Sequence, residues 1–299
     1  MKTTTSELDT AEILSSVKRV QLRTRKAVTD MVAGGFASVF RGSGMEFEEV
    51  REYVPGDDVR AIDWNVTART GRPYIKKFVE EREQTVMLAH DISASTRLGS
   101  NRRTVRQSAA ELAAVLAFSA TQSGDRAGYL GFTDELELEL PPRSGNRQAF
   151  RIIREALYRD TEDAATDLTV ACDHLSHVLK RRSYIFLLSD FLTEGYERSL
   201  GVLARRHDVV ALRLVDALHH ELPSVGMVRW RDPETGREMM VDTGSSKVRQ
   251  AMRQHAEERT VALRTLLGKH RVDLVDIPLG GSVVDPLVGY LKMRERRRR

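Results

Sequence analysis

The pattern of apolar and polar positions divides the chain into a helical start, a short mixed segment and a long alternation of strands and helices. Residues 6–32 carry apolar side chains at helical spacing between lysines and arginines, which predicts an amphipathic helix. Residues 45–84 are turn-rich, and Pro55-Gly56 suits the centre of a type II turn. We therefore expect a helix and linker over 1–44 and a small β-rich subdomain over 45–84.

From residue 85 onward, short apolar runs alternate with helical patterns, which is typical of βαβ units. The predicted strands are 85–91, 126–132, 184–190, 208–216 and 271–277. The predicted helices are 103–122, 147–159, 167–181, 196–206 and 246–268. Strict alternation at 135–140 indicates an antiparallel edge strand. These patterns predict a doubly wound, mainly parallel α/β domain over 85–293, with a hairpin insertion at 226–242.

Composition and charge narrow the classes of protein that fit. The chain has 299 residues, of which 41% are hydrophobic and 30% charged, so a sizeable core is available. Lysines and arginines number 47 against 43 acidic residues, and the two signs are interspersed, so we do not expect nucleic acid as a partner. Much of the excess lies in a basic tail at 294–299, which we expect to be solvated.

The sequence carries no sign of a membrane or secreted protein. No apolar run approaches the ~18 residues of a membrane-spanning helix, and the N-terminus lacks the pattern of a signal peptide. The expected location is the cytoplasm. The single cysteine, Cys172, excludes an intrachain disulfide and lies in an apolar-periodic stretch, so we expect a buried thiol.

Oxygen-bearing side chains follow the first strand of the α/β domain at alternate positions: Asp91, Ser93 and Ser95. The C-terminal ends of parallel strands are where open sheets place their ligand sites. Carboxylates and hydroxyls suit Mg²⁺ or Mn²⁺, which are hard cations that prefer oxygen ligands. Thr166 and Asp190 follow later elements and can converge on the same ion. The alternative interpretation is that Thr166 or its neighbour caps a helix and that Asp190 is an ordinary turn residue.

This order and spacing resemble the metal-ion-dependent adhesion site of von Willebrand factor A domains. There, a DxSxS loop, a threonine that opens a helix and an aspartate that ends a later strand share one Mg²⁺. The resemblance implies that the metal ligands are Asp91, Ser93, Ser95, Thr166 and Asp190. The chain departs from the family at residues 164 and 165, which are alanines where the family often has glycines.

The upstream segment resembles a bacterial family known as domain of unknown function 58. The motifs REYVPGDD, RAIDW, ARTG and EERE carry the resemblance, which covers roughly residues 40–190. Members commonly accompany MoxR-type AAA+ ATPases and are thought to act in maturation or assembly of other proteins. The resemblance therefore implies an ATPase of this type, or its protein client, as a partner.

The charged residues of this segment can also be interpreted physically. Asp57 and Asp58 can cap nearby backbone N–H groups, and Arg51, Arg60 and Arg69 can pair with them. We favour a structural network over a partner-facing surface here. We also expect Trp64 to anchor packing.

The sequence thus favours a metal-dependent protein-interaction module that binds an acidic partner residue, without catalysis. Two alternatives stay open: a metal-dependent phosphohydrolase, and a nucleic-acid-binding protein that uses the basic tail. The first needs a cationic clamp near the ion, and the strand-end loops offer no obvious one. The second lacks a recognisable nucleic-acid-binding motif.

Overall fold

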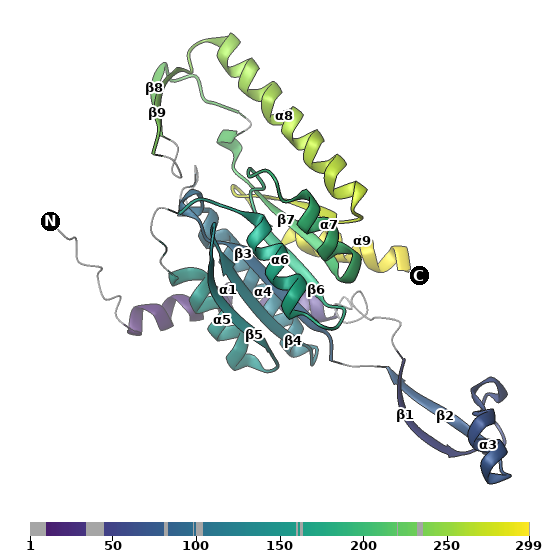
Figure 1. Ribbon diagram of the computed structural model, residues 1–299. Helices are drawn as coiled ribbons and strands as arrows, with labels where there is room; N and C mark the ends of the chain where they lie inside the picture. Colours follow the sequence, from purple (N-terminus) through teal and green to yellow (C-terminus); the bar gives the residue numbers. More distant parts are fainter. Residues whose placement is uncertain are drawn as a thin grey trace. The chain divides into compact units, whose positions relative to one another are not determined.

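A computed structural model describes residues 10–33, 45–80, 83–97, 99, 104–159, 161, 164–219, 221–231 and 236–298 (Figure 1). The chain forms two compact units. The larger unit contains residues 1–39 and 85–299, and the smaller unit contains residues 40–84.

The larger unit is built on a six-stranded sheet in the order β10-β7-β6-β3-β4-β5. Its strands are β3 (Thr85–Asp91), β4 (Arg126–Phe132), β5 (Leu136–Arg143), β6 (Tyr184–Ser189), β7 (Asp208–Val215) and β10 (Asp273–Pro278). Every neighbouring pair is parallel except β4 and β5, and β5 lies at the edge of the sheet. The predicted mainly parallel α/β fold and its antiparallel edge strand are therefore confirmed.

Helices cover both faces of this sheet. The helices packed on one face are α6 (Leu168–Val178), α7 (Glu197–Arg206) and α8 (Ser246–Lys269), and they share a core with alternate residues of the strands. The opposite face is covered by α4 (Val105–Gln122) and α5 (Asn146–Tyr158). The N-terminal helix α1 (Thr10–Ala33) packs against α4 and α5, and buries Val17, Val28 and Met31. This helix is thus part of the larger unit.

Alternation along β3 decides which side of the sheet each functional residue occupies. Met87 and Ala89 contribute to the core beneath α6, so Asp91 at the end of the strand shares their side. His90 points the other way, as expected, and its Nδ1 lies 2.9 Å from the hydroxyl of Tyr129.

The C-terminal helix α9 (Asp285–Arg298) includes most of the segment that we expected to be a solvated tail. For Arg294 that expectation is wrong, because its side chain is only 13% exposed. Its guanidinium pairs with the carboxylate of Asp208 and donates to the hydroxyl of Tyr290 at 2.6 Å. Burial next to a carboxylate partner, rather than position in the sequence, decides the role of this arginine.

The smaller unit is an antiparallel pair, β1 (Met45–Glu52) and β2 (Tyr74–Glu80). The connection between the two strands contains the 3₁₀ helix η1 (Val59–Ala61) and the short helix α3 (Trp64–Thr70). Figure 1 shows α3 at one end of this hairpin. The predicted structural network is smaller than expected: of the three arginines, Arg51 is the one whose side chain bonds Asp57, at 2.7 and 2.9 Å.

Trp64 does not anchor packing, and that prediction is wrong. Its side chain is 69% exposed, whereas the preceding Asp63 is buried. Asp63 is the N-cap of α3 and accepts hydrogen bonds from the backbone N–H groups of Asn65 and Val66. These bonds fix the start of the helix, of which the exposed Trp64 is the first residue.

The remaining elements are a second hairpin and short turns. The strands β8 (Met227–Arg231) and β9 (Glu238–Asp242) form the expected hairpin, although its predicted turn lies mostly outside the described residues. The 3₁₀ helices η2 (Ala94–Arg97) and η3 (Ala217–His219) follow β3 and β7. Among the described residues, every helix is too short or too polar to cross a membrane.

Candidate functional site

The candidate site lies where the C-terminal ends of β3 and β6 meet. From β3 the chain continues to β4 on one side, whereas β6 and β7 occupy the other side. The direction of winding therefore reverses between β3 and β6. Ligands of open α/β sheets bind at the carboxyl ends of the strands next to such a reversal.

Asp91 is the centre of this site and is almost entirely buried, with 1% of its surface exposed. The backbone N–H of Ser93 donates to its Oδ1 at 3.1 Å, and the hydroxyl of Thr166 donates to the same oxygen at 3.4 Å. The hydroxyl of Ser189 donates to Oδ2 at 2.8 Å. The carboxylate is thus contacted from three segments that are far apart in the sequence.

The two serines of the loop after β3 lie side by side. The Oγ atoms of Ser93 and Ser95 are 3.0 Å apart; Ser93 is buried and Ser95 is half-buried. The loop turns directly into η2, and Thr96 donates its hydroxyl to the Ser93 carbonyl at 2.7 Å. This short turn presents alternate hydroxyls on the side of the loop that holds Asp91.

Backbone hydrogen bonds fix the loop that carries Thr166. The N–H of Ala94 donates to the carbonyl of Ala164 at 3.1 Å, and the N–H of Asp167 donates to the carbonyl of Thr133 at 3.1 Å. The alanine at 164 therefore still joins this loop to the Ser93 loop. Asp167 supplies the cap of α6 by accepting from Thr169 N at 2.7 Å. Because Asp167 caps the helix, the Thr166 side chain faces Asp91.

Asp190 follows β6 and accepts a hydrogen bond from the N–H of Leu192 at 3.0 Å. Its charge acts on Asp91. Burial raises the pKa of Asp91 well above its usual range, and repulsion from the Asp190 carboxylate raises it further. Hydrogen bonds from Ser93 and Ser189 act in the opposite direction without cancelling these effects. The site therefore holds two carboxylates whose negative charges disfavour each other.

Phe191 fixes the chain directly after Asp190 in an unusual conformation. Its φ is +58°, a left-handed value that a bulky residue rarely adopts. Its N–H donates to the Ser189 hydroxyl at 3.1 Å, and its buried ring packs near Tyr196, with 6.4 Å between ring centroids. Such strain persists only where the surroundings hold it, and it occurs often at functional sites.

Three contributors were not singled out from the sequence. Ser189 shares its side of β6 with Leu187, so strand alternation was the signal that could have found it. Thr161 and Arg106 both donate to the carbonyl of Ile92, at 2.7 and 3.0 Å. No local pattern marks these two, because they lie far from Ile92 in the sequence.

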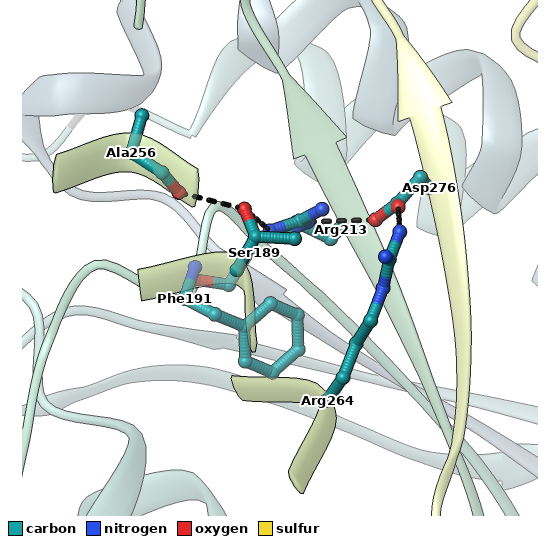
Figure 2. Close-up of polar contacts among 7 residues, drawn as sticks. Ser189, Phe191, Arg213, Ala256, Arg264 and Asp276 are labelled. Carbon is teal, nitrogen blue, oxygen red and sulfur yellow. Dashed lines mark hydrogen bonds and ion pairs between the residues drawn. The ribbon is translucent and has the colours of Figure 1, made fainter. Parts of the chain in front are cut away.

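A small pocket of about 40 Å³ adjoins Asp190. Phe191 and Arg213 line it, together with Thr260 of α8. Figure 2 shows Arg213 in an ion-paired row with Asp276 and Arg264 beside Ser189 and Phe191. The Nε of Arg213 lies 2.7 Å from Asp276, and its Nη1 donates to Thr260 at 3.1 Å. This guanidinium is therefore engaged within the fold.

The donor set fits a hard divalent cation. Hydroxyls of Ser93, Thr166 and Ser189 surround the buried carboxylate of Asp91, and positive charge there would relieve the repulsion from the half-buried Asp190. Within the part of the chain that the structure describes, no group of three or more His, Cys, Asp or Glu side chains can hold a metal. A metal here would depend on the hydroxyls of Ser93, Ser95 and Thr166.

The chain is similar to known proteins in sequence and in structure. It is 32% identical over 241 residues to an uncharacterized protein of Mycobacterium bovis, which covers 79% of this chain and 76% of that protein. The conserved hypothetical protein BatB from Bacteroides thetaiotaomicron is similar in structure, with 14% identity and a TM-score of 0.47 over 72% of this chain and 98% of BatB. The VWA domain of SpRpn10 is similar too, with 13% identity and a TM-score of 0.36 over 70% of this chain and 95% of that domain.

A family model agrees with the upstream motifs and extends well beyond them. The model described as "Protein of unknown function DUF58" matches residues 49–262, which include the smaller unit's connection and the whole candidate site. The chain therefore belongs to the DUF58 family.

Proposed function

We propose that this protein is a metal-dependent protein-interaction module. It binds an acidic side chain of a partner through Mg²⁺ or Mn²⁺ at the end of β3 and β6. The observation that carries the proposal is the buried Asp91, which lies within the repulsive field of Asp190 and is surrounded by hydroxyls. Such an arrangement is unfavourable by itself and becomes favourable with a cation.

The residues that would hold the ion are Asp91, Ser93, Ser95, Thr166 and Asp190. When bound, the ion supplies positive charge that attracts an oxygen anion from outside. The ligands from this chain determine how much of that positive charge stays available to a partner. Ser93, Ser95 and Thr166 offer neutral oxygens, so the carboxylates of Asp91 and Asp190 leave the positive charge incompletely balanced. Ser189 keeps Asp91 in place and is not itself among the proposed ligands.

We propose binding rather than catalysis. A phosphohydrolase needs a cationic clamp that is free to hold a phosphate. Of the two arginines that line the pocket beside Asp190, the buried Arg213 already contacts Asp276 and Thr260, and Arg259 is exposed on α8. In the alternative of nucleic-acid binding through the tail, Arg294 would not contribute, since it pairs with Asp208.

The partner that we propose to test first is a MoxR-type AAA+ ATPase, or its protein client. This choice follows from the DUF58 resemblance of the motifs REYVPGDD and RAIDW. The metal site adds one chemical requirement, namely an Asp or Glu side chain at the partner's contact point.

Metal titration tests the first part of the proposal. Isothermal calorimetry with MnCl₂ should show one site in the wild type, and a loss of affinity of about tenfold or more in Asp91→Asn and Asp190→Asn, a scale of ~1.4 kcal/mol. The exposed acidic residue Asp173 of α6 provides the matched control, and Asp173→Asn should bind as the wild type does. Equal uptake by the wild type and Asp190→Asn would refute the site.

Partner capture tests the second part. The purified MoxR-type ATPase encoded in the same genome should bind in excess Mg²⁺ and dissociate in EDTA. Ser93→Ala should weaken this capture by about tenfold (~1.4 kcal/mol), provided that the variant melts at the wild-type temperature. Equal capture in Mg²⁺ and in EDTA would show that the metal does not form the bridge.

A further inference from the structure

The smaller unit presents large apolar side chains to solvent in the connection between β1 and β2. Val54 is 56% exposed, Val59 is 60% exposed and Trp64 is 69% exposed. All three belong to the short stretch that forms the turn, η1 and the start of α3. Exposed apolar groups gathered in one region mark interaction sites, and tryptophan is among the residues that dominate binding energy at interfaces.

Internal hydrogen bonds hold these side chains in a fixed frame. Asp57 accepts from the Arg51 guanidinium, and its Oδ2 also accepts from the N–H of Val54 at 2.9 Å. Asp58 accepts from the N–H of Arg60 at 2.9 Å, where η1 begins. The cap by Asp63 fixes the start of α3. A partner would therefore lose little free energy in ordering this surface.

Some charged side chains of the same stretch form internal hydrogen bonds or ion pairs, and others face solvent. Asp57 and Asp63 are engaged in the frame just described, and Arg72 pairs with Glu52 at 3.2 Å. Arg60 and Arg69 are exposed, and the structure shows no ion pair or hydrogen bond between their guanidinium groups and the other described side chains. The other exposed cations of this stretch are Arg60 and Arg69, which complement carboxylates, and the exposed anion among them is Asp58.

Net charge indicates which class of acidic partner fits. Residues 40–84 contain ten acidic and eight basic residues, a net charge of −2. Binding of a nucleic acid or a lipid bilayer depends on many cations together, and a unit with this net charge does not supply them. Two exposed arginines in the same stretch as an exposed tryptophan suit a short protein segment instead.

We propose that Val54, Val59 and Trp64, together with Arg60 and Arg69, form a second protein-docking surface, here called the Trp64 surface. It takes a partner segment that carries carboxylate side chains next to an aromatic or aliphatic one. The Trp64 surface lies in a different unit from the metal site and works without the metal.

Peptide selection followed by fluorescence tests this proposal. A random peptide library is selected on the full chain in EDTA, and peptides that bind are titrated against the Trp230→Phe variant, in which Trp64 is the one remaining tryptophan. The expected result is enrichment of sequences with Asp or Glu beside an aromatic or aliphatic residue, together with a blue shift of Trp64 emission. Trp64→Ala and the double variant Arg60→Ala/Arg69→Ala should each bind at least about tenfold more weakly.

Leu22 of α1 is 68% exposed and provides the control, so Leu22→Ala should bind as the wild type does. Since the side chains of Trp64, Arg60, Arg69 and Leu22 are exposed, the variants at these positions should melt within about a degree of the wild type. Peptides that bind Trp64→Ala as tightly as the wild type, or selected sequences without acidic residues, would overturn the proposal. So would self-association that depends on Trp64, measured by sedimentation, or tight binding of a labelled DNA oligonucleotide that depends on Arg60 and Arg69.

Discussion

The hydroxyl of Ser189 donates a hydrogen bond of 2.8 Å to Oδ2 of Asp91, and both side chains are buried. The same hydroxyl accepts from the N–H of Phe191 at 3.1 Å. One serine therefore joins the end of β3 to the strained turn after β6. Asp91 is held from both strands, so the carboxylate is positioned by the fold itself.

Asp91→Asn should stabilise the metal-free protein and abolish stabilisation by metal. The pKa of Asp91 is raised in the folded state, so its ionised form opposes folding, and this loss of stability grows as pH rises above about 4, the usual value for an aspartate. The amide has no charge to lose. In EDTA at pH 8 we expect the variant to be more stable than the wild type by about 1 kcal/mol or more, measured by urea unfolding.

The pH dependence distinguishes this effect from a general change in packing. The advantage of Asp91→Asn in EDTA should shrink as pH falls toward 4, because the carboxyl becomes protonated in the folded wild type and begins to be protonated in the unfolded chain. Excess Mg²⁺ should raise the melting temperature of the wild type and leave that of the variant unchanged. A variant that is less stable than the wild type at pH 8 in EDTA would contradict this account.

Much of the larger unit could be predicted from the sequence because its signals are local. Strands buried on both faces appear as short apolar runs, and alternation then places Asp91 on one side of β3 and His90 on the other. The position of Asp91 at a strand end likewise follows from the pattern. Proximity of Thr166 to Asp91 followed from a family resemblance, and the 3.4 Å contact between their oxygens agrees with it.

The errors concern contacts that no local pattern encodes. Arg294 belongs to a terminal charge run, yet its partner Asp208 lies in a distant strand. Trp64 is the kind of residue that is usually largely buried, yet it is 69% exposed at the start of α3. In both cases the exposure of the side chain depends on how the residues around it pack, which the local sequence does not encode.

Arg294→Ala should destabilise the protein by about 2 kcal/mol, because it leaves the largely buried carboxylate of Asp208 without its cationic partner. The hydroxyl of Tyr290 would also lose a contact. Arg297 is an exposed arginine of the same helix, and Arg297→Ala should change stability by less than about 0.5 kcal/mol. Urea unfolding of the two variants provides the comparison, and equal stability would mean that the Arg294 ion pair contributes nothing.

His207 should make the protein sensitive to mild acid. Burial lowers the pKa of His207 to about 4, and the positive charges of Arg206 and Arg182 act in the same direction. Its Nδ1 accepts the N–H of Ser183 at 3.3 Å, which requires a neutral ring. Because the unfolded chain binds a proton near pH 6.5 and the folded chain does not, stability is complete above pH 6.5 and falls as pH decreases toward 4.

The measurement for His207 is urea unfolding at pH 7.5 and pH 5. As pH falls, the stability of the wild type should decrease by up to about 1 kcal/mol per pH unit more than that of His207→Asn, because the asparagine side chain does not titrate. His255 is exposed on α8, so His255→Asn should follow the wild-type profile. Parallel profiles for the wild type and His207→Asn would show that this ring does not titrate with unfolding.

The hydroxyl of Thr161 should help to position the loop that carries the proposed metal ligands Ser93 and Ser95, without being a ligand itself. It donates to the carbonyl of Ile92 at 2.7 Å, and Ile92 lies between Asp91 and Ser93. Thr161→Val keeps the side-chain shape and removes the donor, so we expect Mn²⁺ affinity to fall by about threefold to tenfold, the scale of one hydrogen bond of ~1 kcal/mol. Thr161→Ser restores the hydroxyl and should recover most of the affinity.

Since a general loss of packing would affect the serine variant at least as much as the valine variant, this order of affinities in calorimetry separates positioning from stability. Unchanged Mn²⁺ affinity in Thr161→Val would show that Arg106, which donates to the same carbonyl at 3.0 Å, holds the loop without it.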